Sequence, residues 1–302
     1  MKRMLFVYNP NAGRGLLSNK LSDVIDIFVK ADYEVVIYPT QKYKDAYYKI
    51  KHMDEQFDMV VCSGGDGTLD EVVTGMMRRD KEKRVPIGYI PTGTTNDFAS
   101  SLHISRDILE AADVCVHGEE FACDIGKFNQ DVFVYVAAFG LFTDVPYQTD
   151  QKLKSVFGHM AYILEGMKRL ANIPSYRIKV TAGDTVIEDE FMIGMISNSK
   201  SVAGFRGITG KEVKFDDGEF EVTLIKRPKN PIELQEIITA LLVESFNTKY
   251  MYIFKSGDIT LEANEEIPWT LDGEFGGEHD CVHILNKKQA LKIMVCAEDE
   301  EE

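Results

Sequence analysis

Short apolar runs in the first third of the chain alternate with segments in which apolar residues recur at helical spacing. The runs are Met4–Tyr8, Glu34–Tyr38, Asp58–Cys62 and Pro86–Ile90. After the first run, apolar residues recur three or four positions apart, at Leu17, Leu21, Val24, Ile25, Phe28 and Val29. Repeated strand–turn–helix order is typical of parallel strands joined by right-handed crossovers, which place ligands at the carboxyl ends of the strands.

Beyond about Phe121 the pattern changes to a period of two. Apolar residues alternate with polar ones at Tyr176–Thr181 and at Glu219–Leu224. Such alternation predicts half-buried antiparallel strands. Two segments with helical spacing, 157–170 and 231–246, interrupt these strands.

We therefore expect an α/β protein of two domains. An N-terminal α/β domain with a parallel sheet would occupy residues 1–121, and a second, mainly antiparallel β domain residues 122–286. The last apolar run, Leu291–Cys296 within 287–302, is expected to return to the first domain as a strand.

The charge balance excludes some classes of partner. The 302 residues include 34 Lys and Arg against 49 Asp and Glu, a formal net charge of −15. This argues against non-specific nucleic-acid binding and against broad electrostatic attachment to anionic membranes. An odd number of cysteines with no C-x-x-C pair predicts free thiols rather than a disulfide framework or a zinc site. No run approaches the ~18 apolar residues of a membrane span, so we expect a cytoplasmic protein whose contact with lipid is peripheral.

The strongest chemical signal is the turn Ser63–Glu71 between a strand and a helix, with the sequence SGGDGTLDE. Its glycines let the backbone approach a bound group and free several N–H donors. A helix that begins there adds the positive end of its dipole, which suits phosphate. Asp66 in the same turn repels phosphate, and it is expected either to hold a nucleotide-bound magnesium ion or to cap the helix.

Two further turns, each after a predicted strand, accompany this one. Asn9–Gly15 follows the first strand, and Pro91–Asn96, with the sequence PTGTTN, follows the fourth. In order and spacing, NPNAG, GGDGTLDEV and PTGTTNDFA resemble the catalytic family of diacylglycerol kinases, and the bacterial soluble lipid kinases in particular. The GGDGT turn alone is shared with sphingosine kinases, NAD kinases and phosphofructokinases. The resemblance extends over the whole chain, through LKSVFG, KFDDGEFEV and LDGEFGG.

The resemblance implies a fold of the NAD-kinase/phosphofructokinase kind for the first domain, with ATP as phosphoryl donor. It implies that the ATP site is lined by Asn9, Pro10, Asn11, Ala12, Gly13, Thr40, Gly64, Gly65, Asp66, Gly67, Thr68, Leu69, Asp70 and Thr94. Asp70 departs from the family, which usually carries Asn there.

Acidic residues far along the chain are candidates for the general base. Asp272 and Glu274 flank a glycine, and a lipid hydroxyl needs a base within hydrogen-bond reach. In isolation Asp-Gly is a favoured hairpin turn. The resemblance implies that this acidic motif lies near the acceptor hydroxyl, so we expect Asp272 or Glu274 as base, with Asp66 as the contender. The resemblance also implies that Lys154 contacts phosphate or an acid near the acceptor; its alternative role is an ordinary surface lysine.

A second acidic turn lies at Phe215–Glu219. The resemblance implies a structural Mg²⁺ held by Asp217 with the carbonyl groups of Lys214 and Glu219. On the residues alone this segment is an exposed turn. Asp144 lies where some relatives place an acid near the lipid head group.

The function expected from the resemblance is a Mg²⁺- and ATP-dependent kinase that phosphorylates the hydroxyl of diacylglycerol or a related lipid, giving a phosphatidate-type product. The alternatives are an NAD-kinase-like enzyme with a soluble acceptor, and a non-catalytic regulator that binds nucleotide or lipid. Membrane contact is expected at a helix flanked by Lys152, Lys154, Lys168 and Arg169, unless that helix packs in the core. Whether the chain forms a homodimer is left open.

Overall fold

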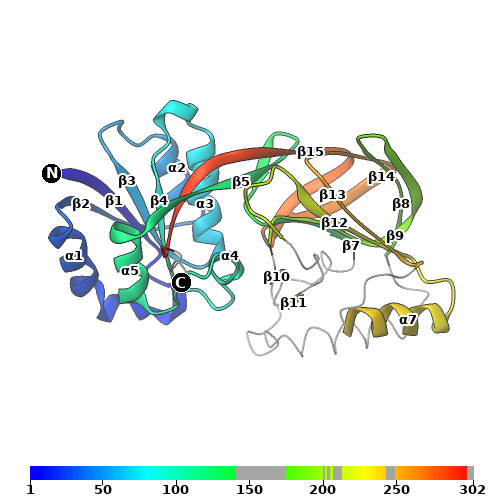
Figure 1. Ribbon diagram of the computed structural model, residues 1–302, viewed down its shortest axis with the longest axis horizontal. Helices are drawn as coiled ribbons and strands as arrows, with labels where there is room; N and C mark the ends of the chain where they lie inside the picture. Colours follow the sequence, from blue (N-terminus) through cyan, green and yellow to red (C-terminus); the bar gives the residue numbers. More distant parts are fainter. Residues whose placement is uncertain (141–173, 200, 203–204, 207–212, 243–248, 298–302) are drawn as a thin grey trace, which may run out of the picture. The chain divides into compact units, whose positions relative to one another are not determined.

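A computed structural model describes residues 1–140, 174–199, 201–202, 205–206, 213–242 and 249–297 (Figure 1). Asp144, Lys152, Lys154 and the helix expected at 157–170 lie outside these residues. The chain divides into two compact units, one formed by Met1–Ile125 with Lys287–Glu302 and the other by Gly126–Asn286. Among the helices that are described, none is long and apolar enough to cross a membrane.

The first unit is built on parallel strands. They are β1 (Lys2–Tyr8), β2 (Tyr33–Pro39), β3 (Met59–Gly64) and β4 (Ile87–Pro91), in the order β4-β3-β1-β2. All three neighbouring pairs run parallel, and the register places Tyr8 beside Ser63 and Gly64 beside Pro91. The carboxyl ends of these strands therefore lie along one edge of the sheet.

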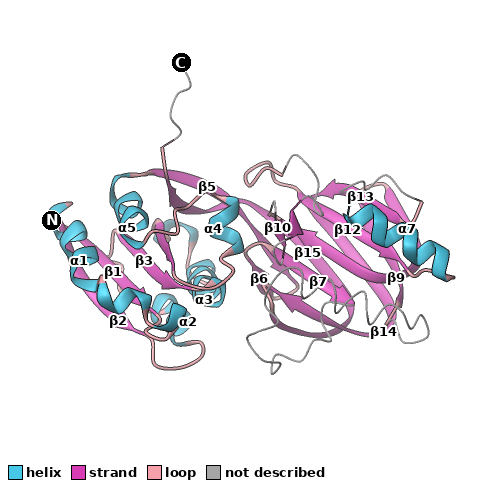
Figure 2. Ribbon diagram, turned by 90° about the horizontal axis from the view of Figure 1, so that it is seen from below, coloured by secondary structure: helices cyan, strands magenta, loops and turns pink. Residues whose placement is uncertain are grey.

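Helices connect the strands of this unit (Figure 2). They are α1 (Leu21–Lys30), α2 (Asp45–Lys51), α3 (Asp66–Met77), α4 (Asp97–Ser101) and α5 (Ile108–His117). Short 3₁₀ turns occur at Ala12–Arg14, Leu16–Asn19 and Lys81–Lys83. The α3 helix buries residues at positions i, i+3, i+4 and i+7, namely Leu69, Val72, Val73 and Met76. This apolar stripe is what holds an amphipathic helix on a core.

The second unit is mainly antiparallel. Its strands include β6 (Asp131–Phe133), β7 (Val136–Gly140), β8 (Tyr176–Ala182), β9 (Thr185–Ser197), β12 (Phe220–Lys226), β13 (Met251–Ser256) and β14 (Asp258–Leu271). Both β7 and β8 pair with β9 and with β14, so the pairing closes into a ring. A short pair, β10 (Ser201–Val202) with β11 (Phe205–Arg206), and the helix α7 (Pro231–Leu242) complete the described elements. The expected α/β class is confirmed.

Two long strands carry the chain from one unit to the other. They are β5 (Glu119–Phe128) and β15 (Glu274–Val295), which pair with each other. In the first unit, Ile293 of β15 lies beside Ile87 of β4 in parallel register. The expected strand at Leu291–Cys296 is therefore the end of a much longer strand that begins in the second unit.

The predicted alternation of buried and exposed residues is confirmed in one strand of the second unit and is wrong in another. In β8, Ile178 and Val180 are buried while Arg177 and Lys179 are exposed, as expected for a half-buried strand. In β12 the expectation is wrong, because Glu221 is buried together with the apolar residues. The physical reason is that both faces of β12 are covered, and the ammonium of Lys255 on the neighbouring β13 lies 3.1 Å from the Glu221 carboxylate and offsets its charge.

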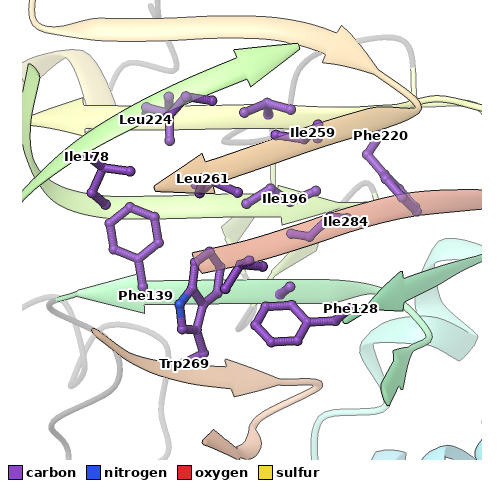
Figure 3. Packing of buried hydrophobic residues seen from close by; sticks show 14 of the residues in the cluster. Phe128, Phe139, Ile178, Ile196, Phe220, Leu224, Ile259, Leu261, Trp269 and Ile284 are labelled. Atoms are coloured by element: carbon purple, nitrogen blue, oxygen red, sulfur yellow. The ribbon is translucent and has the colours of Figure 1, made fainter. Parts of the chain in front are cut away.

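Aromatic and aliphatic side chains pack together in the core of the second unit (Figure 3). The ring of Trp269 lies 4.9 Å from that of Phe139 and 5.0 Å from that of Phe128, both near edge-to-face. Such pairs add to the free energy gained from burial. The five cysteines are all free; Cys281 and Cys296 are exposed, and the other three are buried.

Replacing Phe139 by Ala should lower the free energy of unfolding by about 3–5 kcal/mol, because the ring leaves a cavity beside Trp269. The control is Val186→Ala, since Val186 is 59% exposed on β9, and it should cost about 0.5 kcal/mol or less. Trp269 is the single tryptophan and reports on this core, so urea denaturation followed by fluorescence measures both variants. Equal effects of the two substitutions would contradict this picture of the core.

Candidate functional site

The turns after the parallel strands lie side by side at one edge of the first unit. Backbone hydrogen bonds join the strand ends: Asn9 N–H donates to the Ser63 carbonyl (2.9 Å), Thr40 N–H to the Tyr8 carbonyl (2.8 Å), and Thr92 N–H to the Gly64 carbonyl (2.8 Å). The structure thus brings together residues from each turn that was expected to line the ATP site, which are separated by up to 85 positions in the chain.

The turn after β1 is shaped by an asparagine and a glycine. The Asn9 side-chain oxygen accepts the N–H of Asn11 at 2.9 Å and closes a local turn. Gly13 has φ +56°, and a Cβ placed there would lie 2.3 Å from the Thr92 carbonyl oxygen. A residue with a side chain is therefore incompatible with the close approach of this turn to the one after β4.

The turns after β3 and β4 touch backbone to backbone. A Cβ on Gly93 would lie 2.5 Å from the Gly65 Cα, and a Cβ on Gly64 would lie 2.3 Å from the Thr68 hydroxyl. Helix α3 begins immediately after Gly65, which supplies no side-chain cap. Gly67 is exposed in the first helical turn. This leaves the amino end of α3 open to an anion.

Asp66 does not cap α3, which removes one of its two expected roles. One of its carboxylate oxygens accepts the N–H of Asn96 at 2.9 Å. The other, Oδ1, is buried without a hydrogen-bond partner. Burial, and next the negative charge of Asp97, raise the pKa of Asp66 to about 6. A buried carboxylate oxygen that lacks a donor is the feature expected of a group that binds a cation.

Asn96 organises the turn after β4. Its φ is +51° and its side chain is buried; the side chain accepts the N–H of Gly93 (3.0 Å) and donates to the Gly93 carbonyl (2.9 Å). The Tyr89 hydroxyl donates to the Gly64 carbonyl at 3.2 Å, and burial raises its pKa well above the usual value. Thr94 lies exposed in the loop that Asn96 closes.

Glu71 is a positioning residue that the sequence did not single out. Its carboxylate accepts the N–H groups of Lys44 (2.7 Å) and Ala46 (3.0 Å) at the start of α2. Helix α2 follows the turn that contains Thr40, so Glu71 ties that turn to α3. Asp70, the residue that departs from the family pattern, accepts the hydroxyl of Thr74 at 3.3 Å. The sequence signal for Glu71 was its place in the GGDGTLDEV motif, where no role was assigned to it.

In the second unit, Asp272 and Glu274 belong to one hairpin with different surroundings. Asp272 and Gly273 have φ values of +52° and +86° and join β14 to β15, so the expected Asp-Gly hairpin turn is confirmed. The buried Asp272 carboxylate accepts three backbone N–H groups, from Val134 (2.5 Å), Tyr135 (2.9 Å) and Val136 (2.9 Å). Glu274 is exposed.

The Asp217 turn contains a built-in cation. The carboxylate of Asp217 accepts the Glu219 N–H (3.0 Å) and the Lys255 ammonium (3.1 Å), and Lys255 also lies 3.1 Å from Glu221. Burial raises the pKa of Glu221 to about 7, although Lys255 opposes this shift. Among the described residues no three His, Cys, Asp or Glu side chains gather into a metal-binding group. A magnesium ion here would therefore depend on backbone carbonyls as well as on Asp217, as in the expected set with Lys214 and Glu219. Lys154 lies outside the described residues.

Replacing Asp66 by Asn tests the buried carboxyl group. Because the folded pKa (about 6) exceeds the ordinary 3.8, the wild-type protein loses stability as pH rises through 6, whereas Asn does not ionise. The variant should gain up to about 3 kcal/mol in free energy of unfolding relative to wild type between about pH 4 and pH 8. Urea denaturation across this range measures the difference. The exposed Asp54→Asn serves as control, and a flat difference for Asp66→Asn would contradict the burial.

Comparison with known proteins shows which family this chain belongs to. Residues 3–128 match the model of the diacylglycerol kinase catalytic domain. The chain is 35% identical to a diacylglycerol kinase of Staphylococcus carnosus, over 97% of this chain and 94% of that protein. It is also 35% identical to one of Staphylococcus aureus, over 97% and 92%. A crystal structure described as a "putative diacylglycerol kinase" of Bacillus anthracis superposes with a TM-score of 0.83 at 25% identity, covering 97% of this chain and 95% of that one. The chain therefore belongs to the diacylglycerol kinase family.

Proposed function

We propose that this protein is an ATP-dependent lipid kinase, which transfers the γ-phosphoryl group of ATP to the hydroxyl of diacylglycerol and gives a phosphatidate-type product. Full-length identity to diacylglycerol kinases supports this activity. The structural observation that carries it is Asp66, whose Oδ1 is buried without a partner beside the open amino end of α3.

ATP binds to the first unit in this proposal, with its phosphates at the start of α3. Donors come from the backbone of the Gly64–Asp70 turn, and the Asn9–Gly13, Thr40 and Thr94 positions surround it. Small glycine and hydroxyl groups suit this role, because catalysis of phosphoryl transfer depends mainly on positioning and electrostatics. The parallel strands β4-β3-β1-β2, with the Gly64–Thr68 turn at their carboxyl edge, support the NAD-kinase/phosphofructokinase-like fold for this unit.

Magnesium is the counter-ion proposed for the nucleotide, and Asp66 is the residue that would hold it. Mg²⁺ prefers carboxylate oxygens and nucleotide phosphates as ligands. Bound there, Mg²⁺ would supply positive charge that neutralises the phosphate oxygens. The buried oxygen of Asp66 fits this ligand, because a cation offsets the cost of ionising a carboxyl group whose pKa is raised by burial.

Glu274 is the proposed general base, in preference to Asp272. Three backbone N–H groups occupy the Asp272 carboxylate, which is buried, so its negative charge already serves to hold the hairpin. Glu274 is two residues away on the same hairpin and exposed, so an acceptor hydroxyl can approach it. Asp272 then acts as the positioning residue for Glu274, and the second unit is the acceptor domain.

A membrane lipid as acceptor requires peripheral contact with the bilayer. The basic cluster expected to make this contact, Lys152, Lys154, Lys168 and Arg169, lies outside the described residues. An NAD-kinase-like activity on a soluble acceptor remains the alternative, since it shares the Gly64–Thr68 turn. Incubation with radiolabelled ATP and a panel of diacylglycerol, other lipids and NAD, followed by thin-layer chromatography, separates the two functions. Labelled phosphatidate supports the proposal, and label in the NAD product alone would overturn it.

Substitutions in the hairpin test the assignment of the base. Glu274→Gln keeps the shape but removes the basic group, so turnover should fall by about 10²–10⁴-fold while ATP affinity and melting temperature stay near wild type. Asp272→Asn should lower melting temperature and turnover together, because an amide cannot accept three N–H groups as a carboxylate does. Near-normal turnover of Glu274→Gln would move the base elsewhere, and Asp66 would be the next candidate.

The proposed structural metal is tested at Asp217. Asp217→Asn should lower the melting temperature by about 3–6 °C and should abolish any rise in melting temperature on adding Mg²⁺. Asp216→Asn is the matched control, because it changes the neighbouring acid in the same turn. If Asp217→Asn responds to Mg²⁺ as wild type does, the segment is only a turn.

A further inference from the structure

Phe275 is an exception to how this chain places its phenylalanines. It is 67% exposed. Every other phenylalanine whose side chain the structure describes is buried or half-buried. Exposed apolar residues are common on proteins, so exposure alone has no meaning. What gives this residue a role is its position, next to Glu274 at the start of β15.

Strand pairing and hydrogen bonds hold the backbone that carries Phe275 in place. Leu271 pairs with Glu274, and Thr270 pairs with Phe275, in the β14–β15 hairpin. The Asp272 carboxylate anchors the turn to three N–H groups of Val134–Val136, and the N–H of Asp272 donates to the Val136 carbonyl at 2.9 Å. The ring of Phe275 is therefore presented on a hairpin that strand pairing and the Asp272 carboxylate hold in place.

Glycines flank the Glu274–Phe275 pair along the chain. Gly273 precedes the Glu274–Phe275 pair, and a Cβ placed there would find no atom within 4 Å. Gly277 follows with φ +93°, and Gly276 packs against Leu271, where a Cβ would lie 2.8 Å from the Leu271 side chain. The hairpin tip thus carries one carboxylate and one phenyl ring, with open space beside Gly273.

A carboxylate next to an apolar ring matches an amphipathic acceptor. Diacylglycerol carries a hydroxyl group at one end and hydrocarbon chains at the other. Successive side chains of a strand point to opposite faces, so an acceptor that reaches both residues must lie across the open tip of the hairpin, where Gly273 leaves room. A small soluble alcohol without hydrocarbon chains gains far less from the ring.

We propose that Phe275 is a specificity-determining residue that contacts the acyl chains of the lipid acceptor while Glu274 faces the acceptor hydroxyl. The inference rests on the proposed function, since it concerns the same acceptor site. Burial of the ring against hydrocarbon releases water from both surfaces and favours acceptors with long chains. Selection of a lipid over a soluble alcohol is thereby built into the hairpin that carries the base.

Kinetics with two acceptors test this contact. Phe275→Ser should raise the KM for dioleoylglycerol in neutral mixed micelles by about tenfold, the scale expected for loss of one buried aromatic contact. The KM for ATP, and the kcat/KM for dibutyrylglycerol in free solution, should change far less, because that acceptor has little hydrocarbon to bury. Phe275→Leu should restore most of the preference for dioleoylglycerol.

Val186→Ser is the matched control, because Val186 is another exposed apolar residue of the second unit and should leave both acceptors unaffected. An unchanged KM for dioleoylglycerol in Phe275→Ser would overturn the proposal. Equal losses with both acceptors would also overturn it, because the ring would then support Glu274 rather than bind the chains. Failure of the wild-type protein to phosphorylate either acceptor would instead overturn the proposed function.

Discussion

The backbone of the turn after β3 approaches the turn after β4 so closely that no side chain fits between them. Gly65 and Gly93 meet almost Cα to Cα, and Gly13 meets the Thr92 carbonyl in the same way. Glycines are required here by contact between segments of the chain, and α3 begins directly after this contact, at Asp66. The same packing buries Asp66 against Asn96 and gives the site its charge.

The protein uses buried carboxylates for different purposes, and their partners decide which. Asp272 accepts three N–H groups, so its negative charge is stabilised and its carboxylate links the hairpin to the backbone of Val134–Val136. Asp66 accepts the N–H of Asn96 but keeps one buried oxygen without a donor. Ionising its carboxyl group in the folded protein therefore costs free energy, and a bound cation would offset that cost. Asp217 and Glu221 share Lys255, an ion pair within the chain itself. Three acidic sites thus have three electrostatic roles.

The second unit joins a rigid scaffold to an exposed tip. Pairing of β7 and β8 with both β9 and β14 closes the sheet, and the aromatic cluster around Trp269 fills it. The hairpin that carries Glu274 and Phe275 follows directly on Leu271, the last residue of β14. For the base and the apolar contact proposed at this tip, such a support limits the conformational entropy lost when an acceptor binds.

The sequence by itself determined the alternation of strands and helices in the first unit, the antiparallel character of the second, and the Asp272–Gly273 hairpin. These are local properties, because periodicity and turn chemistry act over a few residues. Tertiary structure decided what depends on contacts between distant segments. Glu221 looked like the solvent side of a strand and is buried, because both faces of β12 are covered and Lys255 of the neighbouring strand pairs with its carboxylate. Glu71 lay in the recognised motif without an assigned role, and it accepts the N–H groups of Lys44 and Ala46, which lie more than twenty positions away. Asp66 was placed at the correct turn from its motif, but its orphaned oxygen follows from burial by the turn after β4, and burial is a property of the packed chain.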